Sequence, residues 1–464
     1  MRLNDSAMAL LLALGAGSCS SGTFTDDVEQ DAAVAGDASA GDAAGSGDAS
    51  LADAGQLDAN VAPDARDASI PDAGQLDANV APDARDASLA DAGQLDANVA
   101  PDARDASIPD ATADSSVAPD SGATSPTIGG CPIFPSDHIF NTPINGLPLH
   151  PSSAQFMATV GNYRIHLDLG QSENMAAPDT YYGIPYNVVH GNTFPWASVS
   201  YTSSDTANMT WDPTDESDCA VSSLHTFVSP CVKSAAPAPV LPIPQSVLVE
   251  GGIFPDVPSQ SYGDHHILLV DADTCRLWEI YHAYTGSGST WNIFGSASFD
   301  LRSNALRPAG WTSADAAGFP IVPLLLRADE ASSGTIKHAL RFTISSSSIR
   351  IAYTWPARHL TTNGSMSTSL PPMGQLFRLK ASYVIPSTYS TQSKAILTAL
   401  KTYGMYLSDG GSNMYIQGEP SANWSDSVFT EVQSVASSQF EAVDLLPIQQ
   451  RAGFSVDSGA VPPP

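Results

Sequence analysis

The sequence predicts a mainly β or α+β fold, with a body of antiparallel sheet, helices near the C-terminus and a disordered spacer in front of the folded part. Short runs rich in Ile, Val, Tyr, Trp and Thr dominate the middle of the chain, and helical periodicity follows only late. Phe24 is the only aromatic residue between positions 20 and 130, whereas the other 35 follow Cys131. Because strands and helices occupy separate stretches instead of alternating, a parallel α/β sheet is not expected.

The stretch 8–17 (MALLLALGAG) is the longest uninterrupted apolar run in the chain. Its length is roughly half of what a helix needs to cross a bilayer, and such a run is typical of the core of a secretory signal peptide. At its end, Ala16-Gly17-Ser18-Cys19 resembles the lipobox of bacterial lipoproteins, whose cysteine is lipidated after export. We therefore interpret 1–19 as a signal peptide with a lipobox and Cys19 as the lipidation site. An ordinary cleaved signal with an unmodified cysteine is the alternative.

Residues 20–130 are dominated by Ala, Asp, Gly, Ser and Pro, and they contain three copies of DAGQLDANVAPDARDAS that begin at Asp53, Asp72 and Asp91. Each 19-residue unit offers too little apolar area to offset the entropic cost of ordering it. The segment also carries 22 acidic residues and 3 arginines, whose net repulsion favours an open chain. It is interpreted as an extended spacer; calcium binding, the alternative, lacks the closely spaced acidic pattern of a calcium loop.

Composition and motifs exclude several classes of function. The formal net charge is −30, whereas nucleic-acid binding requires a basic face, so no nucleic-acid partner is expected. The chain contains no Gly-x-Ser-x-Gly elbow, no His-Glu-x-x-His motif and no phosphate-binding loop. A serine hydrolase, a zincin and a nucleotide-dependent enzyme are therefore not indicated, and no motif implies a cofactor or a metal.

The folded domain is expected to span 131–446 and to be followed by a tail, 447–464. Its composition changes at Cys131, and no low-complexity linker divides it. The expected strands are 265–271, 276–283, 338–344 and 349–355. The expected helices are 391–403, capped by Ser390 or Thr391 and ended by Gly404, and 425–435, capped by Ser425 or Asp426.

Four cysteines remain when Cys19 is set aside. An even number of cysteines in an exported chain favours disulfides. Cys219 and Cys231 bracket a short loop and are expected to pair, which leaves Cys131 to pair with Cys275. A structural zinc site, the alternative, has no Cys-x-x-Cys spacing to support it.

The first candidate site lies at the open end of a hairpin. Asp264-His265-His266 begins one expected strand, and Tyr281-His282 ends the next. A three-residue loop would place Asp271 opposite Cys275 and Asp264 opposite His282, with His266 on the same face. A loop that is longer or shorter by one residue would instead bring Tyr281 towards Asp264 and His266, and the shorter loop would also bring Glu279.

Each register gathers groups that can transfer a proton, because imidazole titrates near neutral pH and a carboxylate can fix its tautomer. His265 and His266 have a structural alternative, in which a histidine at a strand end simply hydrogen-bonds a buried carboxylate.

A second hairpin, 338–344 with 349–355, would set His338 near Trp355. Arg358 and His359 leave the sheet at the same end, and a guanidinium is suited to a carboxylate or sulfate of a substrate. His338 shares its face with apolar residues, so a buried core histidine is the alternative.

Other acidic residues could supply a two-carboxylate glycosidase site, but their spacing in the sequence does not place them. These residues are Asp300, Asp315 and the pair Asp329-Glu330. Asp315 is expected near the start of a short helix introduced by Thr312 and Ser313. The pair Asp329-Glu330 is expected in a solvated turn.

The stretch from Asp264 to Asp444 resembles a block found in uncharacterised secreted bacterial proteins. The resemblance implies no activity and no site residue. The segments that carry it are SNALRP (303–308), GWTSADAAG (310–318), WPARH (355–359) and PPMGQ (371–375).

The leading hypothesis is a secreted or surface-tethered enzyme that cleaves a polysaccharide, as a glycoside hydrolase or a polysaccharide lyase. In a lyase, Arg358 would neutralise a uronate, His266 or His338 would be the base and Tyr281 the acid. A metal-dependent hydrolase is a further hypothesis.

The alternative is a non-catalytic glycan-binding or adhesion lipoprotein, with Trp291, Trp311 and Trp355 as the contact surface. The expected partner is an extracellular glycan or polysaccharide. The signal peptide and lipobox predict contact with the membrane through the lipid anchor alone and a place in the cell envelope, as an outer-membrane lipoprotein or at the cell surface.

Overall fold

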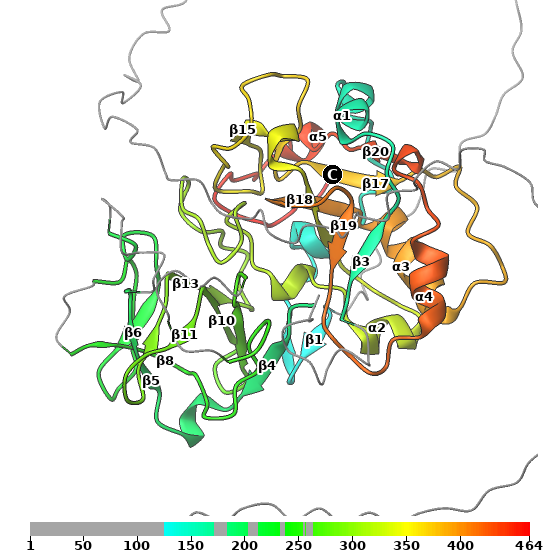
Figure 1. The fold of residues 1–464 in the computed structure, drawn as a ribbon. Helices are drawn as coiled ribbons and strands as arrows, with labels where there is room; N and C mark the ends of the chain where they lie inside the picture. The colour runs from blue at the N-terminus through cyan, green and yellow to red at the C-terminus, as the bar shows by residue number, and fades with distance from the viewer. Residues whose placement is uncertain (1–124, 171–182, 203–211, 233–236, 254–255, 257–262) are drawn as a thin grey trace, which may run out of the picture. The chain divides into compact units, whose positions relative to one another are not determined.

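The structure, a computed structural model, describes residues 125–170, 183–202, 212–232, 237–253, 256 and 263–464 (Figure 1). The described residues belong to one unit of the chain, 65–464. The signal peptide, Cys19 and the three repeats lie outside them, so what the sequence predicts for these segments stays a prediction.

The described strands form three larger sheets and two short pairs. The four-stranded sheet runs in the order β13 (Gly295–Asp300), β10 (Arg276–Tyr281), β9 (Ile267–Asp271) and β4 (Tyr186–Val189). One six-stranded sheet runs β11 (Tyr284–Thr285), β12 (Trp291–Asn292), β5 (Ala197–Ser200), β8 (Pro239–Leu241), β6 (Cys219–Val221) and β7 (Thr226–Val228). The other runs β20 (Phe440–Ala442), β17 (Leu376–Leu379), β18 (Met405–Gly410), β14 (Leu340–Ile344), β19 (Tyr415–Gln417) and β3 (His166–Asp168). The short pairs are β1 (Thr127–Ile128) with β2 (Cys131–Pro132), and β15 (Arg350–Tyr353) with β16 (Pro372–Met373).

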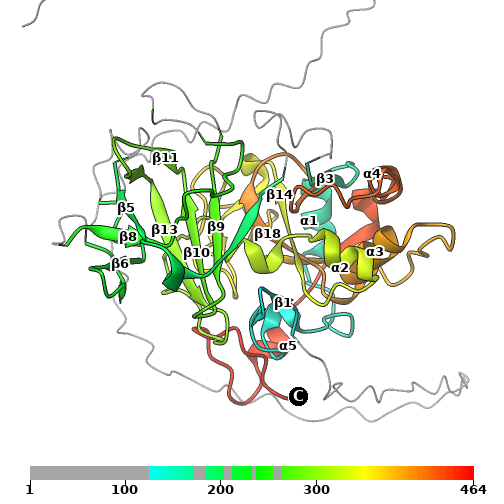
Figure 2. The ribbon, with the colours of Figure 1, turned by 90° about the horizontal axis from the view of Figure 1, so that it is seen from below.

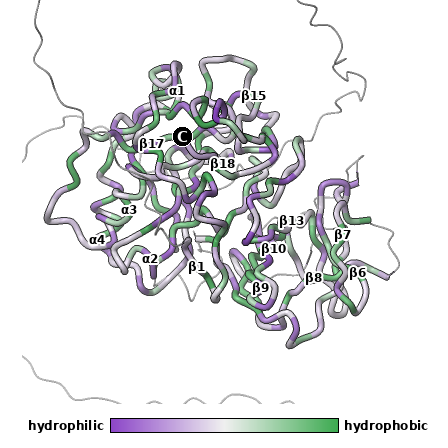
Figure 3. The backbone as a smooth tube through the Cα atoms, turned by 180° about the vertical axis from the view of Figure 1, so that it is seen from behind, coloured by the Kyte–Doolittle hydropathy of each residue, from purple (hydrophilic) through white to green (hydrophobic). Residues whose placement is uncertain are grey.

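The four-stranded sheet is buried on both faces. Leu268, Val270 and Leu277 join the core that continues into the sheet containing β14. The alternate residues Leu269 and Trp278 join a second core against the sheet that contains β5 and β8. The apolar run of β9, visible as green tube in Figure 3, follows from this position, because a strand covered on both sides has no polar face. Figure 2 shows β13, β10 and β9 side by side between the other elements.

The predicted mainly β fold with helices towards the C-terminus is confirmed for the described residues. Several sheets are mixed, since β4 runs parallel to β9 and β14 runs parallel to β18. The helices are α1 (Ser153–Val160), α2 (Ala328–Ser333), α3 (Thr391–Thr402), α4 (Asp426–Val432) and α5 (Leu446–Gln449). No helix of the described segments is long and apolar enough to span a membrane.

The two predicted helices are α3 and α4. The Ser390 hydroxyl accepts a hydrogen bond from the backbone N–H of Ser393 and caps α3, and Gly404 follows its end with φ of 75°. A residue with positive φ ends a helix, and glycine adopts this conformation without a steric penalty.

The predicted hairpin of 338–344 with 349–355 is wrong. β14 pairs with β18 and β19, and β15 pairs with β16. The turn between β14 and β15 contains a short 3-10 helix, Ser346–Ser348, and the N–H of Arg350 then donates to the carbonyl of Pro371 instead of returning to β14.

Both predicted disulfides are confirmed. Cys219 is bonded to Cys231, and Cys131 is bonded to Cys275. Disulfides form and persist in oxidising compartments, so the two bonds indicate an exported protein.

The domain boundaries expected from the sequence need correction at both ends. Thr127–Ile128 already forms β1 and pairs with the strand that contains Cys131. The expected tail packs on the domain: the Trp355 indole N–H donates to the carbonyl of Ser458, and the N–H of Val461 donates to the carbonyl of Asp137. A segment whose backbone groups are paired in this way belongs to the fold.

Candidate functional site

The hairpin of β9 and β10 has the longer of the turns considered. Asp271 pairs with Arg276, not with Cys275, so the three-residue loop and its register are wrong. The turn therefore spans 272–275, and its last residue, Cys275, has a positive φ of 52° and is bonded to Cys131. Tyr281, not His282, is therefore the neighbour of His266, and their ring centroids lie 5.4 Å apart.

His266 is buried and hydrogen-bonded through both ring nitrogens. Nδ1 lies 2.6 Å from Oε2 of Glu250, and Nε2 lies 2.9 Å from the carbonyl oxygen of Ala314. Both partners are acceptors, so the ring donates twice and is an imidazolium. Burial lowers the pKa of His266, but Glu250 and Asp264 outweigh burial and raise it to about 9. A histidine in this protonated state is suited to holding Glu250 and Ala314 in place rather than to accepting a proton from a substrate.

The charge of His266 gives stability a defined pH dependence. Its pKa is about 9 in the folded protein, against an ordinary value of 6.5 for histidine, so its contribution to stability is complete below pH 6.5 and is lost as the pH rises through about 9. We expect His266→Gln to cost on the order of 3 kcal/mol near neutral pH and progressively less in alkali. Urea unfolding of both proteins across this range measures the difference. His190→Gln is the control, because His190 pairs with Asp273 at the surface. A cost for His266→Gln that stays constant with pH would contradict the ion pair.

Asp264 lies exposed next to this pair. The Tyr281 hydroxyl lies 3.5 Å from Oδ1 of Asp264, and the backbone N–H of His282 donates to the carbonyl of Asp264. Although Asp264 is exposed, the surrounding protein displaces water from its carboxyl group and raises its pKa, and the charge of Glu250 adds to the effect. The sequence-predicted group of Asp264, His266, Tyr281 and His282 therefore does lie together, with Tyr281 rather than His282 beside the carboxylate.

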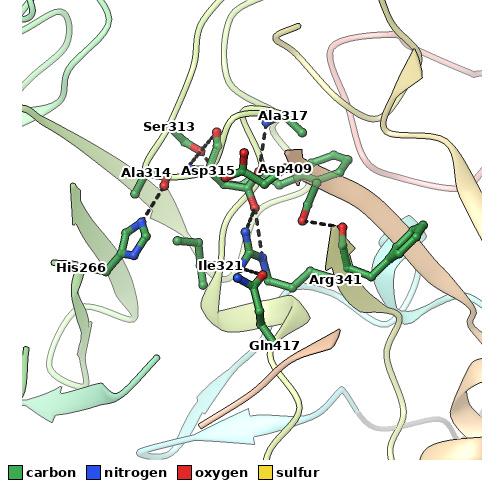
Figure 4. Close-up of polar contacts among 12 residues, drawn as sticks. His266, Ser313, Ala314, Asp315, Ala317, Ile321, Arg341, Asp409 and Gln417 are labelled. Atoms are coloured by element: carbon green, nitrogen blue, oxygen red, sulfur yellow. Dashed lines mark hydrogen bonds and ion pairs between the residues drawn. The ribbon is translucent and has the colours of Figure 1, made fainter. Parts of the chain in front are cut away.

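Arg341 forms the buried centre of the site (Figure 4). It reaches from β14 to Asp315, whose Oδ2 accepts from Nε at 3.1 Å and from Nη2 at 2.6 Å. The side-chain oxygen of Gln417, on β19, accepts from Nη1. The helix start expected at Asp315 is absent. The loop instead turns its carboxylate inward, because a buried guanidinium requires a counter-charge.

Two further carboxyl groups adjoin this ion pair. Asp409 is partly exposed near the end of β18, and burial together with the charge of Asp315 raises its pKa to about 7. Glu279, on β10, is fully buried and accepts hydrogen bonds from the N–H groups of Ile321 and Val322. Burial raises the pKa of Glu279 to about 7 in spite of these bonds.

The strand β3 adds a rim to the site. Asp168 is paired in register with Gln417, the partner of Arg341, and lies 3.4 Å from Nε2 of His166. Burial raises the pKa of Asp168. The His166 ring, which is 45% exposed, stacks on Tyr415 with centroids 4.0 Å apart. The stacked rings of His166 and Tyr415 thus form an aromatic surface next to the Asp168 carboxylate.

The remaining predicted histidines lie outside this group. His338 is buried between the carbonyl of Ala339 and Oε2 of Glu330, which also pairs with Arg327. The pair Asp329-Glu330 lies in the first turn of α2 and not in a solvated turn, since the Glu330 carboxylate is bound by Arg327 and His338. His359 bonds the carbonyl of Ala316 through Nδ1.

Arg358 and the tryptophans do not present the surface expected from the sequence. Arg358 is 2% exposed and bonds the carbonyl of Val456 and the carboxylate of Asp457. Trp355 is buried, so its ring is closed to a glycan. Trp311 lies over the guanidinium of Arg307, and Trp291 is partly exposed on β12.

Four residues of the site were not predicted from the sequence. They are Asp168, Glu250, Arg341 and Asp409. A usable signal existed for Arg341, which interrupts the otherwise apolar run ALRFTI, because a charged residue inside a buried strand needs a specific partner. No comparable signal marks Asp168 or Glu250.

No protein family, no curated protein and no solved structure matches this chain. Among the described residues, no group of three or more His, Cys, Asp or Glu side chains is placed to hold a metal ion.

Proposed function

We propose that the chain is an exported enzyme that hydrolyses glycosidic bonds of an extracellular polysaccharide, with Asp264 and Asp409 as its reacting carboxyl groups. One observation carries the proposal. The exposed residue Asp264, just before β9, and the partly exposed residue Asp409, on β18, adjoin a single buried network, in which His266 is bound to Glu250 and Arg341 to Asp315. Glycoside hydrolysis needs a pair of carboxyl groups of this kind, one to donate a proton and one to act as base or nucleophile.

The protonation state of Asp409 supports its role as the acid. With a pKa raised to about 7, Asp409 retains a proton in weakly acidic and neutral solution and can donate it to the leaving oxygen. The pKa of Glu250 is lowered: His266 overcomes the effect of burial and keeps this carboxylate ionised. Asp264 lies beside the Tyr281 hydroxyl and is the group that attacks the sugar or activates water.

Charge favours hydrolysis over elimination. A lyase must neutralise the carboxylate of a uronate, and Arg358 is instead buried against Asp457. Arg341 is also buried, and its Nε, Nη1 and Nη2 atoms are bound to Asp315 and Gln417. Carboxylates around these two arginines would repel a uronate, so a neutral glycan is the substrate class we propose.

The proposal places the enzyme in the cell envelope. A lipid on Cys19 would hold it at the outer membrane or the cell surface, and the acidic spacer would extend the domain towards its glycan. The membrane would be contacted through the lipid alone.

The test is a panel of polysaccharides incubated with the full-length chain, read by reducing ends and by absorbance of an unsaturated product. We expect reducing ends without unsaturation, and a loss of about 10²- to 10⁴-fold in rate for Asp409→Asn and for Asp264→Asn, the effect typical of removing an acid or base. Asp215→Asn is the matched control, because Asp215 is exposed on another part of the fold.

Three outcomes would contradict the proposal. An unsaturated product would indicate a lyase, and unchanged rates in both variants would place the chemistry elsewhere. Retention on immobilised glycans without any cleavage would indicate a binding module, in which replacement of the partly exposed Trp291 should abolish retention.

A further inference from the structure

The loop 314–318, here called the Asp315 loop, joins the separate parts of the proposed site. Its Ala314 carbonyl accepts from Nε2 of His266, and Asp315 binds Arg341. The N–H of Ala317 lies 2.9 Å from the carbonyl oxygen of Ser408, the residue before Asp409. A displacement of this loop would therefore move His266, Arg341 and Asp409 relative to one another.

The segment 355–359 holds the Asp315 loop from the outer side. The backbone N–H groups of Arg358 and His359 lie 2.9 and 3.2 Å from the carbonyl oxygen of Ala317. The two segments pack closely, since a Cβ atom at Gly318 would lie 3.1 Å from Cβ of Arg358. Gly318 also has a positive φ of 72°, so a side chain there would be strained.

The C-terminal residues 456–461, here called the C-terminal strap, hold the segment 355–359 in turn. Nη1 of Arg358 donates to the carbonyl of Val456 at 2.7 Å, and Nη2 donates to Oδ1 of Asp457 at 2.6 Å. The strap is anchored elsewhere, because the N–H of Gly459 donates to the carbonyl of Asn304 and its own carbonyl accepts from the N–H of Ile139.

We propose that Arg358 is a positioning residue, which couples the C-terminal strap to the Asp315 loop and so fixes the spacing of the carboxyl groups in the site. Its side chain binds the strap and its backbone binds Ala317, so one residue connects the two. The cation is buried at 2% exposure, and removing it would leave the Val456 carbonyl without this donor. Because the Asp315 loop holds the network beside the proposed reacting groups, Asp264 and Asp409, this role rests on the proposed function.

Hydrogen exchange of the full-length chain tests the coupling without a substrate, so its result is separate from the hydrolysis assay. In Arg358→Met, amides of the Asp315 loop are expected to exchange about tenfold faster, since local opening becomes easier, while those of α3 keep their rate. Arg302→Met is the matched control, because the Arg302 side chain is 59% exposed and pairs with Asp300 at the surface. Asp457→Asn should produce a smaller change at the same amides, and it carries the test should Arg358→Met fail to fold.

A second readout separates positioning from general support of the fold. The pKa of the Asp409 carboxyl, followed by NMR, should fall from about 7 in Arg358→Met, because a loosened loop admits water and moves Asp315 away. Arg358→Lys, which keeps the charge, should restore part of both effects. Faster exchange confined to the strap, or an equal increase in α3 and the Asp315 loop, would overturn the proposal, and so would an unchanged titration of Asp409.

Discussion

Replacement of Arg341 by methionine is expected to lower the free energy of unfolding by about 3–5 kcal/mol, because it leaves a buried charge without its partner. The side chain of Asp315 is completely buried, and Arg341 supplies two of its hydrogen bonds. Urea unfolding at neutral pH, followed by tryptophan fluorescence, measures the loss. In this variant the loss should shrink as the solution is acidified, because protonation removes the uncompensated charge on Asp315.

The double variant Arg341→Met with Asp315→Asn isolates the ion pair. Neutralising both partners should restore part of the stability that the single variant loses, since the remaining amide carries no uncompensated charge. Arg302→Met again serves as the surface control, with an expected cost below about 1 kcal/mol. If Arg341→Met also lowers the free energy of unfolding by less than about 1 kcal/mol, the Arg341–Asp315 ion pair does not hold the site together.

Removal of the bond between Cys131 and Cys275, with both replaced by alanine, is expected to cost about 5 kcal/mol according to the chain-entropy relation. The reason is the length of the loop it closes, since the two residues are 144 positions apart. Unfolding of the variant in denaturant measures the cost.

The second disulfide provides the matched comparison. Cys219 and Cys231 are 12 positions apart. For a loop of this length the same relation gives about 3 kcal/mol. Equal losses for the two pairs would contradict loop closure as the source of stability.

Elements with strong local signals were predictable from the sequence. The helix α3 has an apolar face, a serine cap and a terminal glycine, and each of these acts within a few residues. β9 and β10 were predictable for the same reason, because they adjoin one tight turn. Their register was not, because turns that differ by one residue fit the same sequence, and only the structure shows that Asp271 pairs with Arg276.

The site was predictable only where its residues are close in sequence. Asp264, His266 and Tyr281 belong to one hairpin, and a turn one residue longer or shorter than three would gather all of them. Arg341 and Asp409 come from β14 and β18, whose parallel pairing is a long-range contact that no local pattern encodes. The failed hairpin of β14 and β15 has the same origin, because the partner of β14 lies about sixty residues further along the chain.

The disulfide at Cys131 also determines how the domain responds to mechanical force. A pull on the chain before residue 125 reaches Cys131 and passes through the sulfur bridge to Cys275, at the turn between β9 and β10. The intervening polypeptide bears no tension while the bridge is intact, so β4, β5 and β6 cannot be peeled away one after another from that end. Reduction would make the whole 144-residue separation available for extension. Under load, the redox state of the Cys131–Cys275 bond thus decides whether the polypeptide between these two residues adds to the extended length of the protein.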